Sequence, residues 1–159
     1  MKWLYCNLFS IVMFDELEKY TFKGNFFYRP TDSLEEVCNA PSSYYGVFLV
    51  YALRKGKVEL IYIGKSGVEL FGNANTEGHI CDGLRDNLVD GLHFDETSRK
   101  NCWPVQMFIE DIEALHVHWY VTYDGQYKDR PGYIKIKLLQ VYQGIFGKIP
   151  RWNFGSDRT

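Results

Sequence analysis

Residues 44–67 read YYGVFLVYALRKGKVELIYIGKSG, and this stretch decides the fold class of the chain. Residues 46–53 and 58–64 are two apolar runs rich in Val, Ile, Leu, Tyr and Phe, a composition typical of buried strands. The RKGK segment between them supplies a glycine for a tight turn. The stretch therefore predicts an antiparallel β-hairpin.

The rest of the chain adds a third strand and several helices. Residues 115–122 alternate between two faces, which predicts a strand with one face buried and His116 and His118 exposed on the other. Residues 133–146 carry apolar side chains at helical spacing before a glycine. Shorter helical segments are expected at 15–20, 32–38, 80–89 and 105–111. These elements predict an α+β domain in which helices flank a three-stranded antiparallel sheet.

Length and composition indicate one intracellular domain. The chain has 159 residues, of which 46% are hydrophobic, so it is long enough for a core and too apolar for disorder. Its four cysteines form no CxxC pair, which favours a reduced, cytoplasmic protein over a disulfide scaffold or a zinc site. Residues 1–14 form an apolar run that is too short to span a membrane, and we expect a buried strand or helical turn there.

Charge is distributed unevenly along the chain although the net charge is only −2. Residues 44–65 contain four basic and one acidic side chain, and residues 128–159 contain seven basic and two acidic ones. Residues 66–127 between them contain three basic and eleven acidic side chains. If the two basic segments meet in the fold, they form a local positive surface suited to an anionic partner; ordinary solvated surface charge is the alternative.

Six segments occur in an order that resembles the GIY-YIG nuclease superfamily, and in particular a bacterial subgroup of it. In chain order they are GVF (46–48), YIG (62–64), LVDGLHF (88–94), NCWPVQM (101–107), IEALHVHWYVT (112–122) and LLQVYQGIFGKIPRWN (138–153). The resemblance covers residues 44–154, so residues 1–159 are expected to form a single GIY-YIG-like domain with residues 1–43 as an N-terminal extension.

The resemblance implies metal-assisted hydrolysis of a phosphodiester. In the family a strand tyrosine activates or orients the attacking water, and an arginine on the following helix holds the scissile phosphate. A glutamate on the last helix binds a divalent cation, and an asparagine near the end supports the site. The cation and the arginine stabilise the negative charge that develops on the phosphoryl oxygens.

Three positions of this chain depart from that pattern. Phe48, Asn87 and Lys135 stand where the family has its first-motif tyrosine, its arginine and its glutamate. The residual motif positions are Tyr62, Lys65 and Asn153, together with Arg85, which lies two residues from Asn87. An ammonium at the metal position repels a cation, so the chain is expected to bind no metal and to need no cofactor, or Mg²⁺ if it is active.

The sequence thus predicts a nuclease-like protein whose catalysis is impaired. We expect it to bind DNA weakly and without sequence preference, or to act through a protein partner, with no membrane involved. The side chains expected to contact DNA are Lys65, Lys135, Lys137 and Arg151. The alternative is an active, divalent-metal-dependent and restriction-like DNA endonuclease that uses Tyr62, Lys65, Arg85 and an unidentified acid.

Overall fold

The structure is a computed structural model that describes residues 13–67, 83–94 and 96–154. Most of the expected N-terminal element, residues 1–12, lies outside the described residues, as do residues 80–82 of the expected helix at 80–89. The described part is a mixed α+β structure, as the sequence predicts.

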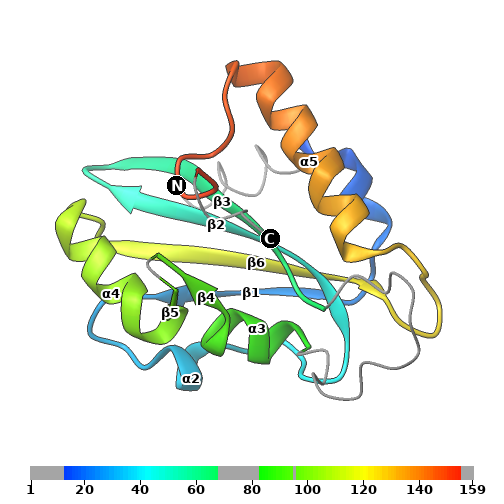
Figure 1. Cartoon of the computed structure of the whole chain (residues 1–159), viewed down its shortest axis with the longest axis horizontal. Coiled ribbons are helices and arrows are strands. Elements are labelled where there is room, and N and C mark those ends of the chain that lie inside the picture. Colours follow the sequence, from blue (N-terminus) through cyan, green and yellow to red (C-terminus); the bar gives the residue numbers. More distant parts are fainter. Residues whose placement is uncertain (1–12, 68–82, 95, 155–159) are drawn as a thin grey trace.

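A four-stranded antiparallel sheet forms the centre of the described structure (Figure 1). Its order is β1 (Lys23–Tyr28), β6 (Ala114–Tyr123), β2 (Tyr45–Arg54) and β3 (Lys57–Lys65). The last of these, β3, is an edge strand.

The predicted hairpin is confirmed as β2 and β3. Its turn consists of Lys55 and Gly56, both with positive φ, and Arg54 pairs with Lys57 across it. Two consecutive residues with positive φ match the twist of the flanking strands, which is why a glycine is useful there. The register then shifts by one residue, because Val50 pairs with Tyr62 while its neighbour Tyr51 pairs with Leu60. This irregularity leaves Ile61 unpaired with β2 immediately before Tyr62.

The expected number of strands was wrong, because β1 pairs with β6 as a fourth strand. Its sequence, KGNFFY, begins with a lysine, a glycine and an asparagine, which are poor strand formers. Gly24 is nevertheless suited to its place, since an added Cβ would lie 2.5 Å from the Trp119 ring on β6. Tertiary packing against that ring explains a strand that local propensity does not predict.

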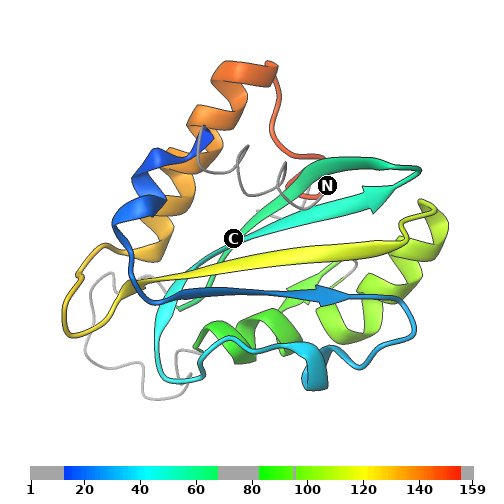
Figure 2. The same cartoon turned by 180° about the vertical axis from the view of Figure 1, so that it is seen from behind.

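Helices cover both faces of the sheet (Figures 1 and 2). On one face lie α2 (Leu34–Val37), α3 (Leu84–Asp90) and α4 (Arg99–Ile109), with the short strands β4 (Leu92–His93) and β5 (Thr97–Ser98) between the last two. On the other lie the 3-10 helix η1 (Asp15–Lys19) and α5 (Pro131–Phe146). The helix expected at 105–111 corresponds to α4, which begins earlier, at Arg99, and ends at Ile109.

Two buried clusters, one on each face, hold these layers together. The first includes Phe48, Tyr62, Leu88, Trp103 and Trp152. The second includes Leu17, Leu49, Ile63, Leu138 and Tyr142. Because both faces of β6 are covered, His116 and His118 are only 4% and 5% exposed, and the expectation that they face solvent was wrong.

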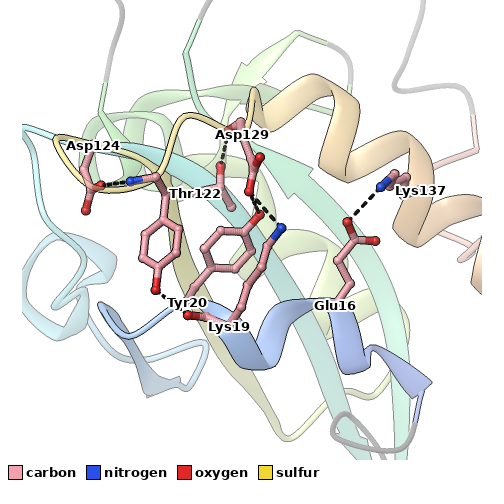
Figure 3. A network of polar contacts seen from close by, with 8 residues as sticks. Glu16, Lys19, Tyr20, Thr122, Asp124, Asp129 and Lys137 are labelled. Atoms are coloured by element: carbon pink, nitrogen blue, oxygen red, sulfur yellow. Dashed lines mark hydrogen bonds and ion pairs between the residues drawn. The ribbon is translucent and has the colours of Figure 1, made fainter.

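A polar network fastens η1 to α5 and to the segment that precedes it (Figure 3). Tyr20 donates a hydrogen bond of 2.7 Å to Asp129, which also pairs with Lys19 at 2.9 Å. Lys137 of α5 pairs with Glu16 of η1 at 3.0 Å. These contacts anchor the start of the described chain to the last helix. None of the helices within the described ranges is both long and apolar enough to cross a membrane.

Candidate functional site

Tyr62 lies at the centre of the candidate site, on the edge strand β3. The C-terminal segment fixes the backbone on both sides of it. Trp152 N donates to Ile61 O at 2.8 Å, and the Asn153 amide accepts from Ile63 N and donates to Ile63 O, both at 2.9 Å. Asn153 thus completes the hydrogen bonding of the edge strand as a further strand would.

Phe48 and Gly64 shape the surroundings of the Tyr62 ring. The Phe48 ring centroid lies 5.8 Å from that of Tyr62. A Cβ added to Gly64 would lie 2.2 Å from the Phe48 ring and 2.7 Å from the Tyr62 ring, so both rings pack over the glycine. Phe48 is fully buried, and its ring brings no hydroxyl to the site.

Arg99, at the first residue of α4, contacts the Tyr62 hydroxyl. Its Nη2 donates to Tyr62 Oη at 3.1 Å, and its Nη1 donates to the backbone oxygen of Asn87 and, at 3.2 Å, to Asn87 Oδ1. The guanidinium passes over Gly91, where a Cβ would lie 2.0 Å from Nη1. Asn87, where no guanidinium was expected, therefore binds the guanidinium of Arg99, which comes from a different helix.

Lys135 also lies beside Tyr62. Its Nζ is 5.9 Å from the centroid of the Tyr62 ring, and the residue is only 8% exposed. Lys135 comes from α5 and Arg99 from α4, helices that cover opposite faces of the sheet. Both reach Tyr62 because β3 is an edge strand. Lys135 and Tyr62, which lie far apart in the sequence, are therefore neighbours in the fold.

Arg85 and Lys65 are placed differently. Arg85 donates to the backbone oxygens of Cys38 at 2.9 Å and Glu35 at 2.7 Å, so its guanidinium fastens α3 to the α2 region. Lys65 is half-buried at the C-terminal end of β3, three residues after Tyr62.

The two other expected DNA contacts are engaged in ion pairs. Lys137 pairs with Glu16, as described above, and its Nζ also lies 4.6 Å from the Tyr133 ring centroid. Arg151 pairs with Glu59 and, through Nε at 2.7 Å, with Glu110. Burial alone would raise the pKa of Glu110, but hydrogen bonds from Gln106, Arg151 and Trp152 lower it. Arg151 therefore fastens the C-terminal turn.

Arg99 and His93 are the residues near Tyr62 that the sequence analysis did not identify. His93 accepts a hydrogen bond from Trp103 Nε1 on Nδ1 at 3.0 Å, so its Nε2 carries the proton and donates to Trp152 O at 3.1 Å. Its ring centroid is 4.4 Å from that of Tyr62. No local signal marked Arg99, because the helix expected at 105–111 did not reach it and the side chain meets Tyr62 only through the tertiary fold.

The charged groups beside Tyr62 suit an anion better than a metal ion. Arg99 and Lys135 bring two positive charges and no oxygen ligand, whereas Mg²⁺ requires oxygen ligands such as carboxylates. Within the described ranges, no group of three or more His, Cys, Asp or Glu side chains could hold a metal ion. Arg99 and Lys135 can therefore bind and orient an oxyanion, but neither of these two side chains supplies an oxygen ligand for a metal ion.

Comparisons of the chain with protein-family models, with curated proteins and with solved structures found no match.

Proposed function

We propose that this protein is a GIY-YIG nuclease-like protein with substituted catalytic positions, which binds the phosphate backbone of DNA and does not cut it. The observation that carries the proposal is the convergence of four motif positions on a fifth, Tyr62. Phe48 and Lys135 lie against the Tyr62 ring, Asn153 holds the next residue of its strand, and Asn87 holds the arginine that contacts its hydroxyl. These positions follow from the sequence resemblance and lie far apart in the chain.

The side chains at these positions support binding rather than cleavage. Arg99 supplies a guanidinium, the group best suited to hold phosphate oxygens. Lys135 supplies a positive charge where hydrolysis would need a metal ligand, and Phe48 supplies no hydroxyl. Since each such catalytic group contributes on the order of 100-fold or more to a rate, the loss of two keeps cleavage below detection.

Lys65, which is half-buried at the end of β3, is the expected DNA contact that remains best placed for this role. Lys137 and Arg151 already pair with carboxylates, so a phosphate would have to compete with those partners. Lys65 continues from Tyr62 along β3 and extends the positive charge beyond the tyrosine. A site with few phosphate contacts binds weakly and without sequence preference.

The proposal is tested by fluorescence anisotropy with a labelled DNA duplex over a series of salt concentrations, and by plasmid nicking with Mg²⁺ and Mn²⁺. We expect binding that weakens steeply as salt increases, because bound lysines release counterions, and no nicking. Lys65→Glu should weaken binding. Its matched control is Lys148→Glu, an equal charge change at an exposed residue beyond the end of α5.

Three other outcomes are informative. Metal-dependent nicking that Tyr62→Phe abolishes would establish the alternative, an active endonuclease. The absence of any DNA binding would exclude the proposed function and leave action through a protein partner. Equal loss of affinity in Lys65→Glu and Lys148→Glu would assign the binding to net charge rather than to the site at Tyr62.

A further inference from the structure

Arg99 is a buried cation without a carboxylate partner among the described residues. It is 4% exposed, and its hydrogen bonds go to Asn87 O, Asn87 Oδ1 and the Tyr62 hydroxyl, which are all neutral acceptors. An arginine side chain stays protonated in proteins, and a buried charge that is not paired is costly. The site around Arg99 therefore carries a positive charge that its described surroundings do not balance.

The guanidinium also keeps one donor unused. Arg99 Nε is buried and has no hydrogen-bond partner in the described structure. Buried polar atoms in native proteins are nearly always hydrogen-bonded, so an exception needs an explanation. Arg151 Nη2 is the other such atom in the described part of the chain, but Arg151 is paired with two carboxylates.

A purely structural role accounts for only part of this arrangement. Asn87 lies in the last turn of α3, and a positive charge there stabilises the helix dipole. The Phe48 and Tyr62 rings, whose centroids lie 5.4 and 5.5 Å from Arg99 Cζ, attract the cation. Neither interaction uses Nε or requires Nη2 to contact a tyrosine hydroxyl.

We propose that Arg99 and the Tyr62 hydroxyl form a phosphate subsite that needs no metal ion. Arg99 Nε donates to one phosphate oxygen. The Tyr62 oxygen already accepts from Arg99, so its O–H is oriented away from the guanidinium and donates to a second oxygen. Lys135 adds positive charge close to the ring, and Asn87 is a positioning residue that fixes the guanidinium. The assignment of the phosphate to a nucleic-acid backbone rests on the function proposed above.

The side-chain ¹⁵N–¹H resonances of arginine test this subsite directly. Because Arg99 is only 4% exposed, the first probe should be small, and inorganic phosphate is suitable. Arg99 Nε–H is assigned from the signal that Arg99→Lys removes, and phosphate is added in EDTA. We expect a saturable shift of this resonance. Arg151 Nε–H, which already donates to Glu110, is the internal control and should not shift.

An isosteric variant separates a binding role from a structural one. Asn87→Asp keeps an oxygen acceptor for Arg99 but places a carboxylate 3.2 Å from Nη1, which neutralises the site. The Arg99 resonance should then lose its response to phosphate, with affinity at least 10-fold lower, while the variant stays folded. Gln140→Glu, the same change of charge at an exposed residue of α5, should leave the response intact.

The outcomes for the subsite and for the proposed function are distinguishable. An Arg99 Nε–H resonance that does not move with phosphate, or that moves equally in Asn87→Asp, overturns the subsite even if the protein binds DNA. A saturable shift with phosphate in a protein that binds no DNA upholds the subsite and refutes its assignment to nucleic acid. A shift of similar size at Arg151 would show that phosphate acts through ionic strength and would also overturn the subsite.

Discussion

The side-chain amide of Asn153 forms both backbone hydrogen bonds of Ile63, as donor and as acceptor, at 2.9 Å each. Ile63 is fully buried and lies on the edge strand β3 directly after Tyr62. Without the amide, its N–H and C=O would have no further strand to pair with among the described residues. Asn153 therefore connects the C-terminal turn to the backbone that carries the tyrosine.

Asn153→Ala should destabilise the protein strongly. It leaves two buried backbone groups unsatisfied, each of which costs about 1–3 kcal/mol, so we expect the free energy of unfolding to fall by about 2–6 kcal/mol. Urea denaturation followed by circular dichroism measures this change. Asn101→Ala, at an exposed position of α4, is the control and should change stability little. Equal stabilities of the two variants would contradict the role assigned to Asn153.

Gly91→Ala should displace the Arg99 guanidinium. The φ of Gly91 is −58°, which alanine adopts without strain, so the effect is steric: the new Cβ would lie 2.0 Å from Arg99 Nη1 and 2.2 Å from Asn87 O. Such overpacking typically costs about 1–3 kcal/mol. Thermal denaturation should show a lower Tm. Gly144→Ala in α5, where nothing lies within 4 Å of the added Cβ, should instead stabilise the helix slightly. A Gly91→Ala protein at least as stable as wild type would refute this packing.

Local sequence patterns predicted the elements whose periodicity is strong. The hairpin, the strand at β6 and the helix ending at Gly147 each follow from alternation, turn chemistry or helical spacing. The strand β1 could not be found in this way, because KGNFFY has weak strand propensity and forms a strand through its pairing with β6 and the packing of Trp119 over Gly24.

The candidate site was predictable in part. Resemblance selected Tyr62, Lys135 and Asn153, which the structure brings to one place. It did not select Arg99, because that side chain reaches Tyr62 across the short β4–β5 pair and from a helix whose polar first turn resembles a surface segment. Arg85, by contrast, was selected as a site residue because it is close to Asn87 in sequence. Its guanidinium instead donates hydrogen bonds to the backbone of the α2 region. Contacts of this kind depend on tertiary structure and carry no local signal.

The buried pair His116 and His118 should make the protein sensitive to acid. His118 Nε2 lies 3.1 Å from His116 Nδ1, and His116 Nε2 lies 3.0 Å from Asn25 Oδ1. Burial and the nearby His118 lower the pKa of His116 to about 3, and burial lowers that of His118 to about 4. An unfolded histidine titrates near pH 6.5, so below that pH the unfolded state binds more protons than the folded state.

Stability contributed by these neutral histidines is therefore complete above about pH 6.5 and is lost as the pH falls toward about 4 and then 3. In this window each titrating histidine lowers the free energy of unfolding by about 1.4 kcal/mol per pH unit. His118→Gln keeps an N–H that can donate to His116 and does not titrate. Its stability, measured by urea denaturation at several pH values, should fall less steeply between pH 6.5 and 4. Parallel pH profiles would show that His118 does not contribute.

Lys135→Glu should convert metal-independent anion binding into metal-dependent binding. In the native chain Lys135 Nζ lies 5.9 Å from the Tyr62 ring, so we expect no Mg²⁺ or Mn²⁺ between these residues and DNA binding that is unaffected by EDTA. A glutamate there supplies the oxygen ligand that a hard divalent ion requires, but without the ion it repels a phosphate beside Arg99. DNA affinity of the variant should fall at least 10-fold in EDTA and recover with Mn²⁺.

Calorimetric titration measures the binding of Mn²⁺ to the variant. Fluorescence anisotropy with labelled duplex measures its DNA affinity in EDTA and in Mn²⁺. Lys148→Glu carries the same charge change at an exposed residue beyond the C-terminal end of α5. It should lose some affinity through net charge alone and gain no response to Mn²⁺, because the new carboxylate is exposed and lies beyond the end of α5 rather than at position 135. If the native chain, which has a lysine at position 135, required Mn²⁺ to bind DNA, a carboxylate elsewhere in the chain would have to complete a metal site. A Lys135→Glu protein whose affinity ignores both EDTA and Mn²⁺ would show that the DNA phosphate does not approach Tyr62 at all.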